Sequence, residues 1–152
     1  MRIFDKTILK DKLYPMYVIT FSFLFSLHSF FQVKKAIYIN MNSLNDKINA
    51  DQFYYLQRYS RWYIYVEYII MVIFISILLI SILNNSIQLL SFIKLNNILV
   101  TILLILSCVV AFLYNASLGN LTQPLVLPFT ILTIATVVRM ISVKCISITH
   151  GN

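Results

Sequence analysis

The sequence is poor in charge, in acidic residues and in glycine. Only 11% of its 152 residues are charged and 60% are hydrophobic, which leaves too little polar surface to cover a soluble globule of this length. The two glycines, Gly119 and Gly151, cannot supply the glycine-rich loops that cradle phosphates in nucleotide-binding proteins. The composition therefore predicts a protein of the lipid bilayer and excludes that type of nucleotide site.

Residues for catalysis and metal binding are also scarce. The chain has five Asp and Glu residues and none of the G-x-S-x-G, H-E-x-x-H or P-loop motifs. His28 has no second histidine, cysteine or acid at ligand spacing, so we expect no metal and no cofactor. We expect no enzyme activity; a lipid-processing enzyme, or one whose active site is shared between subunits, is the catalytic alternative.

The two cysteines do not form a C-x-x-C pair. Cys108 is expected about 15 Å deep in the third span at 1.5 Å per residue, whereas Cys145 follows the fourth span. A disulfide needs Cα atoms within about 7 Å of each other, so free thiols are expected.

Long uncharged stretches indicate the membrane spans. No charged residue occurs between Glu67 and Lys94 or between Lys94 and Arg139, and about 20 apolar residues suffice to cross a bilayer as a helix. We predict an all-α polytopic integral membrane protein with four transmembrane helices in a single membrane domain, preceded by an amphipathic N-terminal helix over residues 1–12. The predicted spans are residues 13–33, 62–83, 98–115 and 123–142.

Polar residues mark the connections between the spans. Residues 34–51 are expected to form a polar loop with several candidate caps, and one helix then runs from about Ala50 to Leu83. A turn at residues 84–86 and a short surface-lying helix over residues 87–97 are expected before the third span.

Two prolines fall at the start of the fourth span. Pro124 is expected near the first helical position, where its missing N–H costs little. Pro128 lies deeper and is expected to loosen or kink the first turn.

The first span has two alternative interpretations. A cleavable signal peptide is disfavoured because the apolar run is long, aromatic and lacks a small-residue cleavage site. Four spans put seven Lys and Arg residues on one side and five on the other, whereas a re-entrant first segment gives nine against three and fits the positive-inside rule better. We favour four spans because the segment is uncharged and long enough to cross.

The net charge of +7 comes from short runs of Lys and Arg beside apolar segments. Such runs set topology and contact lipid headgroups, so no nucleic-acid binding is expected. The expected partners are the lipid bilayer and other membrane protein subunits, in a bacterial inner (plasma) membrane or an organelle inner membrane.

Glu67 is the one acidic residue expected inside a span, just below the membrane interface. Candidate partners on the same side are His28, Lys34 and Lys35. Tyr63, one helical turn earlier, has a hydroxyl that can hydrogen-bond the carboxylate. We predict an intramembrane polar cluster of these five residues, which either relays protons or binds a ligand headgroup, or else only fixes helix depth and packing.

Arg139, the only charged residue in the fourth span, is not expected to pair with Glu67. The second and fourth spans run in the same direction, and Glu67 begins one whereas Arg139 ends the other. The two side chains are therefore expected some 25 Å apart across the membrane.

Aromatic residues gather in the first turns of the second helix. Six of the ten tyrosines and the only tryptophan lie between residues 54 and 68, which is typical of a membrane-interface belt. Because Tyr and Trp also dominate interface hot spots, a partner-docking surface is the alternative. The residues assigned to this belt or interface are Tyr55, Tyr59, Trp62 and Tyr63.

Small residues recur at helical spacing on the first span. Ser22, Ser26 and Ser29 lie at i, i+4 and i+7, a spacing that lets helices approach closely and hydrogen-bond. The expected neighbour is another span of the same chain or a separate subunit.

Together these features predict a small non-catalytic membrane protein that acts through intramembrane protein–protein contacts. By analogy of build alone, it is an accessory subunit of a larger membrane complex or an immunity-type recognition protein. The competing prediction is a homo-oligomeric transporter or channel with Glu67 lining the pathway.

Overall fold

Four long helices make up the part of the chain that the structure describes. The computed structural model describes residues 12–41, 49–84 and 86–149, and among these residues there is no strand. The helices are α2 (Tyr14–Met41), α3 (Ala50–Asn84), α4 (Ser86–Tyr114) and α5 (Leu118–Thr149). All four are long and apolar enough to cross a membrane, so the predicted all-α membrane fold with four spans is confirmed. All but the last residue of the predicted N-terminal amphipathic helix lies outside the described residues.

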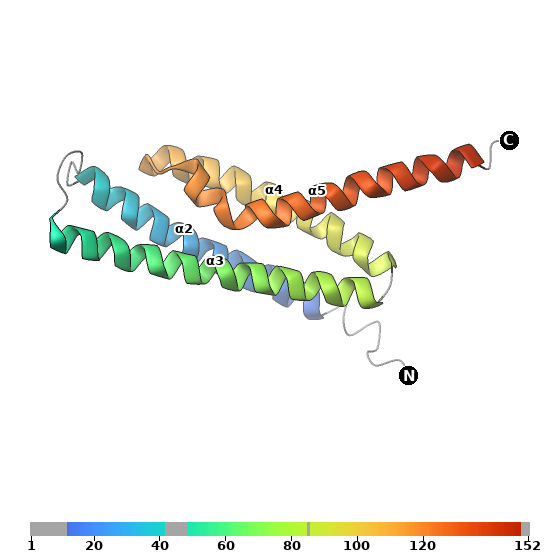
Figure 1. The fold of residues 1–152 in the computed structure, drawn as a ribbon, viewed down its shortest axis with the longest axis horizontal. Coiled ribbons are helices and arrows are strands. Elements are labelled where there is room, and N and C mark those ends of the chain that lie inside the picture. Colours follow the sequence, from blue (N-terminus) through green and yellow to red (C-terminus); the bar gives the residue numbers. More distant parts are fainter. Residues whose placement is uncertain (1–11, 42–48, 85, 150–152) are drawn as a thin grey trace.

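The helices form two antiparallel hairpins. α2 packs most extensively against α3, and α4 against α5, and Figure 1 shows the two pairs lying one over the other. The last turns of α2 and α4 and the first turns of α3 and α5 therefore lie at the same end of the bundle. We call this the basic end, because it contains Lys34, Lys35, Arg58 and Arg61.

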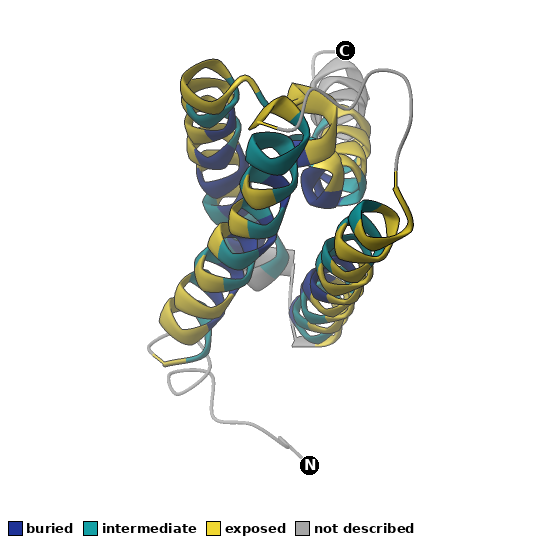
Figure 2. Ribbon diagram, turned by 90° about the vertical axis from the view of Figure 1, so that its left-hand side faces the viewer, coloured by how far each residue is buried: buried dark blue, intermediate teal, exposed yellow. Residues whose placement is uncertain are grey.

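Large apolar side chains fill the space between the hairpins. Phe21, Phe74 and Phe92, from three different helices, are fully buried, and the ring centroids of Phe74 and Phe92 are 5.7 Å apart. Figure 2 shows the buried positions turned inward and the outer faces of the helices exposed. In a bilayer, these apolar outer faces contact lipid rather than water.

A buried hydrogen bond joins α2 to α4 beside this core. The Tyr17 hydroxyl donates to Asn96 Oδ1 at 2.5 Å, and Asn96 Nδ2 donates to the Phe92 carbonyl at 3.0 Å. Both polar side chains are almost completely buried. Since an unpaired polar group is costly in hydrocarbon, these bonds allow an asparagine and a tyrosine to lie inside the bundle.

α2 is longer than predicted, and the polar loop assigned to residues 34–51 is correspondingly too long. The helix continues to Met41, because its last turns pack against the first turns of α3. The rings of Tyr38 and Tyr55 stack with centroids 4.1 Å apart. Most of the shorter loop that remains lies outside the described residues.

The predicted separation between a surface-lying helix at residues 87–97 and the third span is wrong. α4 is one helix from Ser86 to Tyr114. Its two central asparagines do not end the helix, because the amide of Asn96 is bound to Phe92 and Tyr17. Lys94 is exposed on the outer face of the same helix.

α5 begins earlier than predicted, so the placement of Pro124 at the first helical position is wrong. The helix starts at Leu118, and both Pro124 and Pro128 lie inside it. Both proline side chains are fully buried. Each proline removes one backbone N–H from the helix, and Figure 1 shows that α5 changes direction in this region.

The start of α3 agrees with the prediction. The Asn49 N–H donates to Gln52 Oε1 at 2.9 Å, and the Phe53 N–H donates to the Asn49 carbonyl at 2.9 Å. The Gln52 side chain thus satisfies the backbone N–H of the residue before the helix, which is one half of a capping box. The helix that follows, Ala50–Asn84, confirms the long second helix.

The packing predicts unequal effects for two phenylalanines on α2. Phe21→Ala, which empties a fully buried position, is expected to lower the free energy of unfolding by about 3 kcal/mol. Phe23, 67% exposed, faces lipid, and Phe23→Ala is expected to cost less than about 1 kcal/mol. Unfolding in mixed micelles, followed by circular dichroism, measures both values. Equal losses would contradict this arrangement of α2.

Candidate functional site

Glu67 lies inside the bundle toward its basic end. The residue is 8% exposed, and the side chain of Gln123 from α5 hydrogen-bonds its carboxyl group. Among the described residues, the Tyr63 hydroxyl makes no hydrogen bond to Glu67, contrary to the prediction. A neutral amide of the fourth helix therefore occupies the position expected for a tyrosine or a cation.

The sequence interpretation gave Glu67 a charged partner or a tyrosine hydroxyl and did not predict Gln123. The predicted second and fourth spans begin at residues 62 and 123, so the sequence already placed Glu67 and Gln123 at similar depth. The shared direction of α3 and α5 agrees with the sequence interpretation (Figure 1). Position 139 is about 24 Å along α5 from Gln123 at 1.5 Å per residue, although the Arg139 side chain lies outside the described part of the chain.

His28 is the most deeply buried ionisable residue of the predicted cluster. Its side chain is 0% exposed, and its ring meets the ring of Tyr63 edge to face, with centroids 5.7 Å apart. Neither ring nitrogen has a hydrogen-bond partner among the described residues. The structure thus brings His28 and Tyr63 together as predicted, through a ring contact.

The two lysines of the predicted cluster point to different sides of α2. Lys35 Nζ lies 3.3 Å from the Ser60 hydroxyl and 5.5 Å from the centroid of the Tyr63 ring. Lys34 Nζ lies 5.6 Å from the centroid of the Phe30 ring and lines a different surface. Of the two lysines, Lys35 lies beside Tyr63, whereas Lys34 lies on another side of α2.

Gln32 is a further member that the sequence analysis missed. It is 4% exposed. It lies four residues after His28 and three residues before Lys35, on the same face of α2. This 28–32–35 spacing was visible in the sequence as a polar stripe along one helix face.

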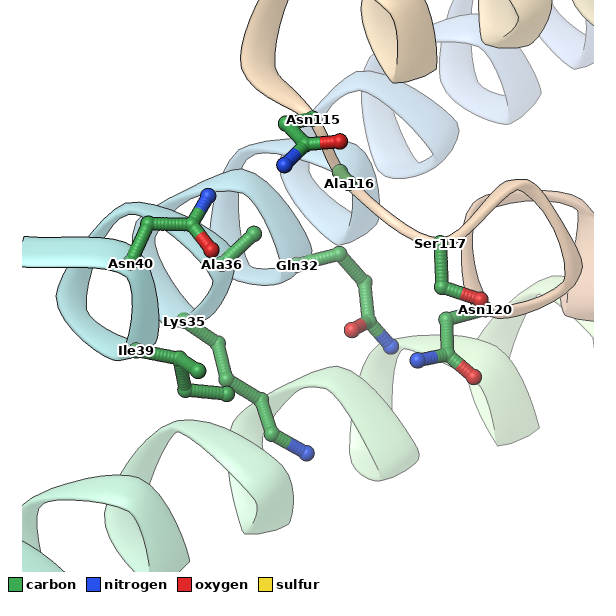
Figure 3. A pocket seen from close by; sticks show the side chains of 9 residues that line it. All are labelled: Gln32, Lys35, Ala36, Ile39, Asn40, Asn115, Ala116, Ser117 and Asn120. Carbon is green, nitrogen blue, oxygen red and sulfur yellow. The ribbon is translucent and has the colours of Figure 1, made fainter. Parts of the chain in front are cut away.

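A polar cavity lies at the basic end, between α2 and the connection from α4 to α5. Its volume is about 150 Å³, and Figure 3 shows the side chains around it. The lining residues include one lysine, four residues with carboxamides and one serine, together with three apolar residues. The lining residues are Gln32, Lys35, Ala36, Ile39, Asn40, Asn115, Ala116, Ser117 and Asn120.

The wall contributed by the α4–α5 connection has a defined local structure. Asn115 follows the last residue of α4 with φ 47°, and the Ala116 N–H donates to the Ala111 carbonyl at 3.1 Å. This is the Schellman arrangement that ends a helix with a left-handed residue, for which asparagine is the usual choice after glycine. Ser117 then caps α5, because its carbonyl accepts the Leu121 N–H at 3.2 Å.

The aromatic residues assigned to the belt divide into two groups. Tyr63 faces inward against His28, apart from the other three residues assigned to the belt. The other three line a hollow of about 320 Å³ on the outer side of α2 and α3. This aromatic hollow is lined by Phe31, Tyr55, Arg58, Tyr59 and Trp62.

Ring contacts shape the aromatic hollow. The Phe31 ring stacks on Trp62 with centroids 6.5 Å apart and meets Tyr59 at 6.2 Å. The hydroxyl of Tyr55 donates to that of Tyr59 at 3.2 Å. Trp62 is still 53% exposed, so these rings form a concave surface that is open to its surroundings.

Two residues of the serine stripe on α2 line a groove between the described helices. Ser26 and Ser29 line an apolar groove of about 500 Å³ between α2 and α4, with Ser107 on the opposite wall. The Ser26 hydroxyl donates to the Ser22 carbonyl at 2.8 Å, within its own helix.

Within the described residues, no group of three or more His, Cys, Asp or Glu side chains could hold a metal ion. Cys108 is a free, exposed thiol, whereas the side chain of Cys145 lies outside the described residues. No family model, curated protein or solved structure matches the chain. Functional inference therefore depends on the geometry described above.

A double-mutant cycle tests the hydrogen bond between α3 and α5. Glu67→Leu and Gln123→Leu are expected to show a coupling of about 0.6 kcal/mol in the free energy of unfolding, the average measured for hydrogen bonds between transmembrane helices, and at most about 1.7 kcal/mol. Thr122→Ala is the control, because the Thr122 hydroxyl donates within α5 to the Leu118 carbonyl. No coupling with Gln123, or an equal coupling with Thr122, would contradict the assignment.

The environment of His28 predicts an unusual result for a buried polar residue. Replacing it with leucine removes two ring nitrogens that lack partners, so His28→Leu is expected to raise the free energy of unfolding by about 1 kcal/mol. Thermal unfolding in detergent measures the change, with Gln32→Leu as a comparison on the same face. A clear loss of stability in His28→Leu would show that the imidazole makes a stabilising hydrogen bond.

Proposed function

We propose that this chain is a non-catalytic accessory or recognition subunit that binds a larger membrane protein at the membrane interface. The observation that carries the proposal is the aromatic hollow at the basic end. A belt that only anchors a helix presents its rings outward to the lipid headgroups. Tyr55, Tyr59 and Trp62 instead surround a concave surface with Phe31 and Arg58.

The composition of the aromatic hollow favours a protein ligand. Trp, Tyr and Arg are the residues most enriched at interface hot spots, which cluster in pockets that exclude water. Arg58 supplies a positive charge at the wall of the hollow, so the complementary group is an acidic side chain flanked by apolar ones. We therefore assign the hollow to a partner segment of this chemistry that lies at the membrane surface.

The groove along α2 and α4 supports the same proposal. Its walls carry Ser26, Ser29 and Ser107 among apolar side chains, and small residues are typical where transmembrane helices approach closely. A partner that occupies the hollow can place a transmembrane helix along the neighbouring face of α2.

A homo-oligomeric channel with Glu67 on a shared pathway is less well supported. Glu67 is 8% exposed and faces the interior of its own bundle, where Gln123 binds it. Phe21 on α2 and Ile70 on α3, both fully buried, lie between the levels of Glu67 and of the Tyr17–Asn96 pair. These residues favour a packing role for Glu67.

The proposal predicts that a tagged copy, extracted gently from its native membrane, carries a different protein in fixed stoichiometry. Trp62→Ala is expected to weaken that complex by at least about 2 kcal/mol, or about thirtyfold in affinity, as for a hot-spot residue. Native mass and subunit composition are the measurements.

Two variants serve as controls for this experiment. Tyr65→Ala removes an aromatic ring that is 61% exposed on the same helix but lies outside the hollow, and it is expected to leave the complex intact. Glu67→Gln is expected to have little effect. A pure multimer of this chain, or equal loss of the partner in the Trp62 and Tyr65 variants, would overturn the proposal.

A further inference from the structure

Lys35 is a cation that has no acidic partner among the residues that the structure describes. Lys35 is half-buried, and its Nζ contacts the Ser60 hydroxyl and the face of the Tyr63 ring. No carboxylate among the described residues forms an ion pair with it, and the nearby Glu67 is bound to Gln123. A partly buried charge is costly unless it is paired, so an anion at this position would stabilise the site.

The polar cavity beside Lys35 offers hydrogen-bond donors and no competing acid. Four carboxamides and one hydroxyl line it, and none of its nine lining residues is Asp or Glu. Gln32 is 4% exposed, and its amide has no hydrogen-bond partner among the described residues. Figure 3 shows this side chain directed toward Asn120 and Ser117 on the opposite wall.

The start of α5 adds a second source of positive potential. Ser117 caps this helix, and Asn120 lies in its first turn; both line the cavity. The first backbone N–H groups of a helix lack partners within the helix, and its N-terminus carries a partial positive charge. Together with the Lys35 ammonium, this arrangement is complementary to an anion with several acceptor oxygens.

We propose that this cavity binds a phosphate group, which is either the headgroup phosphate of an anionic phospholipid or free inorganic phosphate. An apolar cavity of about 150 Å³ in another protein holds benzene, so a phosphate group fits the volume available here. Both sources meet the site at the basic end, which carries Lys34, Arg58 and Arg61. This proposal is independent of the proposed partner, because the aromatic hollow and the cavity share no residue.

The test uses the full chain, delipidated in a maltoside detergent that contains no phosphate. Isothermal titration calorimetry at neutral pH measures binding of two probes, inorganic phosphate and a short-chain phosphatidylglycerol. Removing the cation in Lys35→Gln is expected to weaken binding by about tenfold or more, the usual effect of losing a hydrogen bond to a charged group. Lys35→Arg keeps the charge and is expected to retain most of the affinity.

Lys34→Gln is the matched control, because it removes the same charge from the adjacent residue, which lines the groove on the other side of α2. It is expected to bind both probes as the unmodified chain does. Asn120→Ala removes a lining amide without altering charge and gives a second test if Lys35→Gln does not fold. Circular dichroism checks the helix content of every variant.

Each outcome decides the proposal. Binding of inorganic phosphate that depends on Lys35 or Asn120 supports it and identifies a soluble anion as sufficient. Binding of the phospholipid alone, with the same dependence, supports it and identifies a headgroup site. If neither probe binds, or if the Lys35 and Lys34 variants lose affinity equally, the proposal is overturned.

Discussion

The structure depends on one constraint, which is that a bilayer offers no water to hydrogen-bond the backbone. Helices satisfy this requirement within each segment, and the few polar side chains inside the bundle must then find partners among themselves. Tyr17 with Asn96 and Glu67 with Gln123 meet this need at two levels of the bundle. His28, whose ring nitrogens have no partner among the described residues, lies one helical turn from Gln32 of the cavity.

Most of the fold could be predicted from the sequence, because uncharged stretches of sufficient length specify spans almost regardless of tertiary structure. The ends of the helices could not. The last turns of α2 depend on the stacking of Tyr38 on Tyr55, which is a contact between distant residues. The continuity of α4 depends on Tyr17, which binds the amide of Asn96. The polar residues at the end of α2 predicted a loop, and those in the middle of α4 predicted a break. Packing against other helices keeps both segments helical.

The candidate site was predicted in part. The depth of Glu67 and the helix directions correctly limited its neighbours to one end of the bundle, and His28, Tyr63 and Lys35 do meet there. Uncharged amides such as Gln123 were not predicted as partners, because the prediction was based on formal charge. Which of Lys34 and Lys35 lies beside Tyr63 depends on the rotation of α2 about its axis, because the side chains of adjacent helical residues point about 100° apart. The sequence indicates that rotation only through the polar stripe of His28, Gln32 and Lys35, because the apolar residues of a lipid-facing helix do not reveal it.

The hairpin arrangement also has a consequence for biosynthesis. The most extensive contacts join helices that are consecutive in the chain. The main neighbour of each helix is therefore synthesised directly before or after it. Low sequence separation between contacting elements favours rapid assembly. The surface between α2 and α3 can be buried before α4 and α5 are inserted. Insertion in pairs also delivers α2 with α3, and α4 with α5, already antiparallel, which leaves docking of two preformed halves as the final step.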